Sequence, residues 1–156
     1  MNNIGFTRNL IKGKIAEIVF ERMLREAGIF TIMHFGYEYI LPELTTGNTF
    51  DRESLTMQAI RRAPDFAVIN NETKQVHLIE IKYRIHKDNS DILKIAEQMG
   101  EAWNPSYIFL ATKNGFYFDS IQNVIKNKGD IKELIHKNIP QSLQKKYLKL
   151  LNEMEK

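Results

Sequence analysis

Four consecutive apolar side chains, about two-thirds of the way along the chain, place the strictest condition on its fold. Residues 107–110 read Tyr-Ile-Phe-Leu, inside a strand expected at about 106–111. Because the side chains of a strand alternate between its two faces, this strand must be buried on both sides. A strand of that kind lies inside a sheet that helices cover on each face. We therefore expect an α/β fold.

The spacing of the other apolar residues predicts the helices and strands around this strand. Helical spacing predicts helices at about 7–27, 55–61, 91–103, 121–126, 131–137 and 140–153, and strand-like patterns predict strands at 29–35, 65–69, 75–84 and 116–119. Thr7 is expected to cap the first helix and Gly28 to end it. The segment 36–54 is expected to form a long excursion.

This order predicts one domain over residues 1–156. Its fold class is α/β, with a mixed central β-sheet flanked by helices and an α-β-β-β-α-β core. The core is expected to span about 5–119, and a basic helical extension about 120–156.

The composition excludes several classes of protein. The chain has 156 residues and no cysteine, so it is not a disulfide-stabilised scaffold and has no cysteine nucleophile or thiolate zinc site. It shows no secretory signal and no apolar run of the roughly 20 residues that span a bilayer. We expect a soluble, cytoplasmic protein without a membrane partner.

The positive charge is concentrated in the last third of the chain. The formal net charge is +3; residues 1–100 hold 13 basic and 13 acidic side chains, and residues 101–156 hold 9 and 6. Two interpretations remain open: a solvated helical face, or a rim that contacts phosphates without selecting a sequence. In the second, Lys145 and Lys146 contact nucleic acid.

Two carboxylates and a lysine are expected to meet on a predicted hairpin. Asp65 opens its first strand, and Glu80 and Lys82 share one face of the second. Oxygen ligands from Asp65 and Glu80, with the backbone carbonyl of Ile81 and water, suit Mg²⁺ or Mn²⁺. Such a metal acidifies a bound water and stabilises charge on a phosphate, while Lys82 orients that water or holds the phosphate.

A third carboxylate, Glu17, is expected to join them from the first helix. At 100° per residue it lies at the edge of the buried stripe, where its carboxyl can reach the end of the sheet. The predicted catalytic set is therefore Glu17, Asp65, Glu80 and Lys82. Taken singly, each of these motifs is common as a surface ion pair, and it is their combination and order that favour a site.

These motifs resemble those of the PD-(D/E)xK nuclease superfamily. The resemblance covers roughly residues 5–112 and rests on Gly13-Lys14-Ile15-Ala16-Glu17, Arg62-Ala63-Pro64-Asp65-Phe66 and Leu78-Ile79-Glu80-Ile81-Lys82. The Gly-x-x-Ala-Glu helix is similar to that of archaeal Holliday junction resolvases, although the segment 36–62 is longer than the corresponding loop in those proteins.

The resemblance implies a restriction-endonuclease-like fold and Mg²⁺-dependent cleavage of phosphodiester bonds. It implies metal ligation by Asp65 and Glu80, water activation or phosphate contact by Lys82, and a supporting or metal-binding role for Glu17. Several members of the superfamily carry a glutamine on the helix after the lysine strand, and Gln98 occupies a matching position, where it either lines the site or is an ordinary exposed helix residue. Arg61, Arg62 and Arg84 flank the carboxylates, where they either balance charge or contact the DNA backbone.

The leading hypothesis is thus a metal-dependent DNA endonuclease, including a structure-selective, resolvase-like one. An alternative is a non-catalytic DNA-binding or assembly module on the same fold. RNA as the substrate, the mode of cleavage, sequence specificity and a homodimer remain open.

Overall fold

A five-stranded mixed sheet forms the centre of the protein. The computed structural model describes residues 3–36 and 53–154. The strands lie side by side in chain order and are β1 (Phe30–His34), β2 (Phe66–Asn70), β3 (Val76–Tyr83), β4 (Tyr107–Thr112) and β5 (Gly115–Ser120). Only β3 and β4 pair in parallel, and the other neighbours are antiparallel. The single parallel pair requires a crossover, which contains a helix.

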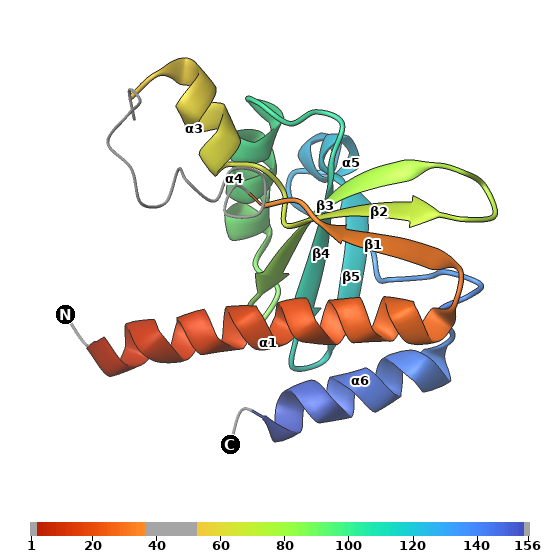
Figure 1. Cartoon of the computed structure of the whole chain (residues 1–156). Coiled ribbons are helices and arrows are strands. Elements are labelled where there is room, and N and C mark those ends of the chain that lie inside the picture. Colours follow the sequence, from red (N-terminus) through yellow and green to blue (C-terminus); the bar gives the residue numbers. More distant parts are fainter. Residues whose placement is uncertain (1–2, 37–52, 155–156) are drawn as a thin grey trace.

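Helices cover both faces of this sheet. They are α1 (Asn3–Ala27), α3 (Leu55–Arg61), α4 (Asn89–Gly100), α5 (Ile121–Lys126) and α6 (Gln141–Glu153). Helices α1 and α6 lie on one face, with α4 and α5 on the other (Figure 1). The expected α/β architecture with a mixed, helix-flanked sheet is confirmed. None of the described helices is long and apolar enough to cross a membrane.

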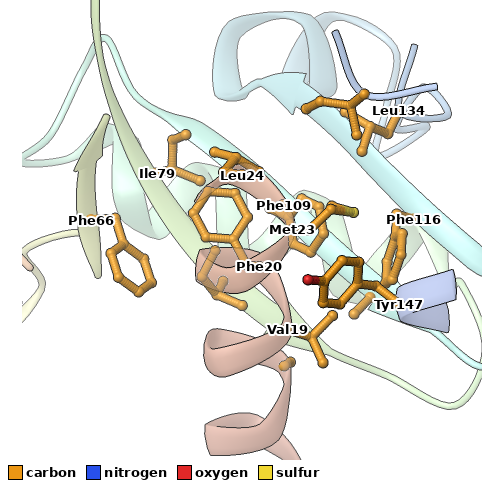
Figure 2. Close-up of a cluster of buried hydrophobic side chains, with 14 of the residues drawn as sticks. Val19, Phe20, Met23, Leu24, Phe66, Ile79, Phe109, Phe116, Leu134 and Tyr147 are labelled. Carbon is orange, nitrogen blue, oxygen red and sulfur yellow. The ribbon is translucent and has the colours of Figure 1, made fainter. Parts of the chain in front are cut away.

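Strand β4 is buried on both faces, as its sequence predicts. Phe109 faces the larger apolar cluster under α1, whereas Ile108 and Leu110 face the cluster under α4 and α5. On the α1 side, the ring of Phe20 lies 4.8 Å from that of Phe109 and 5.3 Å from that of Phe66, measured between centroids (Figure 2). This packing fixes the middle of α1 over strands β2 to β4.

Most predicted elements appear within a few residues of their expected bounds, with two clear errors, of which the first is at the start of the chain. Helix α1 already begins at Asn3, so the prediction that Thr7 caps it is wrong. A capping residue is a local preference, and residues 3–6 continue the helix past it. Gly28 does follow the helix, with a φ of 86° that suits glycine.

The predicted helix at 131–137 is also wrong. This segment instead lies along β5: the amide of Leu134 donates to Phe116, and the amide of Phe118 donates to Lys132. Its apolar residues have helical spacing, but β5 is an edge strand whose backbone groups need partners. Most of the predicted excursion, residues 37–52, lies outside the described residues.

Candidate active site

The site begins where β2 ends and β3 continues. The two strands pair from Ile69–Val76 to Phe66–Ile79, and Asp65 lies just before the first residue of β2. Strand β2 does not extend far enough to pair with Ile81. Instead, the Oδ2 of Asp65 accepts the backbone amide of Ile81 at 2.8 Å. The fold therefore holds this carboxylate against the edge of β3.

The backbone carbonyl of Ile81 lies on the same edge. In a strand, the amide and carbonyl of one residue point to the same side, and the amide of Ile81 points to Asp65. A carboxylate oxygen and a carbonyl oxygen are thus adjacent at this strand end.

Glu80 and Lys82 occupy the opposite face of β3 from its buried isoleucines. They alternate with Ile79 and Ile81, which lie in the α1-side cluster. The Nζ of Lys82 is 3.8 Å from Oε2 of Glu80, and their side chains are 33% and 18% exposed. Both groups are therefore half-buried but open to solvent on one side.

The surroundings of the Asp65 carboxyl group raise its pKa. Burial, followed by the negative charge of Glu80 and a hydrogen bond with it, raises the pKa of Asp65 to about 8, against the opposing effect of the Ile81 amide. Two carboxylates in a poorly solvated site cannot both ionise cheaply. At neutral pH the Asp65 carboxyl therefore holds its proton unless a cation replaces it.

Glu17 completes the cluster from α1. It forms a hydrogen bond with Asp65, and its pKa is raised by burial and by the charge of Asp65, while Lys14 acts in the opposite direction. The Nζ of Lys14 is 3.3 Å from Oε2 of Glu17. The structure thus gathers Glu17, Asp65 and Glu80, with Lys82 beside Glu80, as predicted from the sequence.

Two hollows open next to this cluster. One, of about 220 Å³, is lined by Glu17 and Asp65 together with two residues that the sequence analysis did not include, Glu21 and His34. Glu21 is one helical turn after Glu17, and its Oε1 lies 3.5 Å from Nε2 of His34. The i, i+4 spacing on the helix was the available signal for Glu21. For His34 the available signal was the pairing of β1 with β2, which places His34 opposite Phe66.

The larger hollow, of about 670 Å³, lies on the Lys82 side. It is lined by residues of α1, of the end of β3 and of the segment after β3, including Gly13, Lys82, Arg84 and His86. A Cβ on Gly13 would meet no atom within 4 Å, so this helix surface is open. Ile81 and Lys82 line the hollow, whereas Glu17, Asp65 and Glu80 do not, so it lies beside the carboxylate cluster.

The residues predicted to contact nucleic acid do not all lie close to the carboxylate cluster. Arg84 lines the larger hollow, and its Nε donates to Asp91 at 2.6 Å. Arg62 pairs with Glu101, Lys146 pairs with Glu26 at 2.6 Å, and Glu26 is nine residues along α1 from Glu17. That separation is roughly 14 Å.

The remaining predicted contacts, Arg61, Gln98 and Lys145, have exposed side chains on α3, α4 and α6. The lysines of the basic extension also take part in other ion pairs, such as Lys137 with Glu72.

The oxygen donors suit a hard divalent cation, although they are not arranged as a finished metal centre. Within residues 3–36 and 53–154, no three acidic or histidine side chains have the geometry of a metal site. Asp65, Glu80 and the carbonyl of Ile81 nevertheless supply the kind of ligands that Mg²⁺ takes, with water completing its shell. Burial and Glu80 raise the pKa of Asp65, so a cation bound there would compete with its proton.

Comparison with known proteins gives no relative: no family model matches the chain, and neither a curated protein nor a solved structure does so. The function is therefore argued from the geometry and chemistry of this site.

Proposed function

We propose that this protein is a Mg²⁺-dependent nuclease that hydrolyses phosphodiester bonds in DNA. The observation that carries the proposal is the Asp65 carboxyl, which is held by the Ile81 amide at 2.8 Å and has a pKa of about 8 because of burial and Glu80. A purely structural role gives no reason to bury two carboxylates side by side at a strand end, since this costs free energy. A site that binds a cation does give one.

Each residue of the cluster has a role in this proposal. Asp65, Glu80 and the carbonyl of Ile81 would hold the cation, and the chemistry that Mg²⁺ supplies when bound is Lewis acidity toward a phosphate and water. Lys82, with its Nζ 3.8 Å from Glu80, neutralises the phosphate under attack and orients the water. Glu17 hydrogen-bonds to Asp65 and keeps it in position.

The fold supports the same proposal. The elements α1, β1, β2, β3, α4 and β4, with α3 inserted between β1 and β2, follow the α-β-β-β-α-β order of a restriction-endonuclease-like core, with the acids at the open end of the β2–β3 hairpin. We propose that these six elements form a restriction-endonuclease-like core and that β5, α5 and α6 are additions to it. The positive net charge and the open hollow beside Lys82 favour a polyanionic substrate over a small neutral one.

The test is a cleavage assay on linear duplex, single-stranded and branched DNA and on RNA, with Mg²⁺, Mn²⁺ or EDTA. We expect cleavage of DNA with either metal and none with EDTA. Asp65→Asn and Glu80→Gln should reduce the rate by at least about 100-fold, and Lys82→Met by a similar factor. Glu72→Gln, which changes an exposed acid on the turn between β2 and β3, serves as the matched control and should keep full activity.

The assay also separates the alternatives. DNA binding without cleavage under every metal condition would show a binding module instead, and preference for branched DNA would show a resolvase-like enzyme. Cleavage that persists in both Asp65→Asn and Glu80→Gln would disprove the assignment of the site.

A further inference from the structure

A separate cavity lies toward the other end of the sheet. It has a volume of about 330 Å³, and apolar side chains of α1 and the strands form its walls, among them Leu24, Val68, Ile79 and Phe109. Figure 2 shows Leu24, Ile79 and Phe109 in the buried cluster on this side of the sheet. The cavity reaches Asn70, five residues along β2 from Asp65, which corresponds to roughly 16 Å of strand.

The cavity is a pocket that opens to solvent on one side, since the exposed residues Gln75 and Ile135 also line it. An engineered apolar cavity of about 150 Å³ is enough to bind benzene, and this one is about twice as large. It has room for a molecule of two fused rings.

The rim of the cavity carries a hydrogen-bond donor whose identity the structure determines. Nδ1 of His136 accepts the backbone amide of Asn138 at 3.1 Å. Burial and the charge of Lys137 lower the pKa of His136 below its usual value, so the ring is neutral at neutral pH. A neutral imidazole that accepts at Nδ1 carries its proton on Nε2, and His136 therefore offers an N–H.

Asn70 supplies a second donor at the same rim. Its Oδ1 already accepts the backbone amides of Glu72 and Thr73 at 2.9 and 3.2 Å. The group that remains for a ligand is the side-chain NH₂, which only donates. Asn70 and His136 thus favour a ligand that accepts hydrogen bonds, and Thr73, Gln75 and His77 add further polar groups to the lining.

The cavity also selects against charge. None of the described residues that line it is Asp, Glu, Lys or Arg, so an ionised ligand would lose its hydration without gaining an ion pair. Phe30 lies against His136, with ring centroids 5.4 Å apart, which adds an aromatic wall to the cavity.

We propose that this cavity binds an uncharged, flat, two-ring aromatic molecule that carries a carbonyl-type hydrogen-bond acceptor at one edge. The donor of His136 recognises the acceptor, and the apolar walls bury the rings. This site does not depend on the proposed nuclease activity, and its test does not use DNA.

Coumarin and naphthalene are suitable probes, because both have two fused rings and only coumarin carries a carbonyl. We expect both to shift the methyl NMR signals of Leu24, Val68 and Ile79, and to leave those of Ile92 and Ile95 under α4 unchanged. Coumarin should bind about 3- to 10-fold more tightly than naphthalene, which is the usual effect of one net hydrogen bond.

The variant His136→Phe keeps a ring next to Phe30 and removes the donor. In this variant the affinity for coumarin should fall to that for naphthalene, while naphthalene binding persists; His86→Phe, outside the cavity, should change neither. Absence of methyl shifts up to the solubility limit of both probes would overturn the proposed site. Unchanged coumarin affinity in His136→Phe would overturn the role of the donor.

Discussion

Asp65 is the residue on which both stability and the proposed chemistry depend. Its carboxylate caps the exposed edge of β3 through the Ile81 amide and lies beside Glu80 and Glu17. The hydrogen bond from the amide stabilises the ionised form, but burial and the neighbouring carboxylate outweigh it, and the pKa rises to about 8. A residue placed in this way makes the folded state sensitive to pH.

The first prediction concerns the stability of Asp65→Asn. A carboxyl whose pKa rises from 3.8 in the unfolded chain to about 8 in the folded protein contributes stability below pH 4 and loses it as the pH increases toward 8. Asparagine carries no charge, so in EDTA at pH 8 the variant should be more stable than the parent by at least about 1 kcal/mol, or roughly 2–4 °C in Tm.

Thermal melts of both proteins from pH 4 to pH 8 measure this difference. It should grow with pH and vanish near pH 4, and Glu72→Gln should follow the parent throughout. An Asp65→Asn protein that is less stable than the parent at pH 8 would show that the hydrogen bond to Ile81, rather than charge repulsion, dominates.

At the scale of secondary-structure elements, the sequence predicted the strands best. A two-residue alternation, or an unbroken apolar run such as 107–110, leaves few other arrangements, and all five predicted strands are present. The segment 131–137 was misjudged because its partners are far away in sequence. Whether Phe116 and Phe118 lack backbone partners cannot be read from the local spacing of apolar residues.

The residues of the candidate site were likewise predictable where local patterns place them and not where distant contacts do. Asp65, Glu80 and Lys82 belong to one hairpin, so strand alternation was enough to bring them together, and helical periodicity was enough for Glu17. The pocket wall formed by Glu21 and His34 depends on how α1 lies against β1. Helical spacing places Glu21 one turn after Glu17, but the contact between Glu21 and His34 is a tertiary contact that no local pattern encodes.

The second prediction concerns the link between α6 and the segment 131–139. Nε2 of the buried Gln144 donates to the carbonyls of Leu134 and Ile139 at 3.1 and 3.0 Å. Gln144→Leu should destabilise the protein by about 2–3 kcal/mol, because it leaves two carbonyls without their donor.

Urea denaturation provides the measurement, and Gln141→Leu, an exposed position on the same helix, is its control. If the two variants lose equal stability, the segment is held in place by its apolar contacts and not by Gln144.

For the whole molecule, metal binding and protonation should oppose each other. A cation at Asp65 and Glu80 must displace the proton that their repulsion retains, so its affinity rises with pH. A ligand that binds only the folded state at 100 times its Kd adds about 2.7 kcal/mol of stability.

The third prediction follows from this competition. Mg²⁺ at that concentration should raise the Tm of the parent protein by about 5–10 °C at pH 8 and by less at pH 6. The increase should be absent in Asp65→Asn combined with Glu80→Gln and fully present in Glu72→Gln. A rise of the same size in all three proteins would place the bound cation elsewhere.

The order of the strands in the sheet has a consequence for how the protein is made. Neighbours in space are neighbours in the chain throughout the sheet, so each strand can dock on the one synthesised just before it, although residues 35–65 separate β1 from β2 and residues 84–106 separate β3 from β4. A nascent chain that has emerged only as far as Tyr83 already contains α1, the β2–β3 hairpin and all four residues of the proposed catalytic set. The four residues of the proposed catalytic set can therefore be brought together before β4 is synthesised.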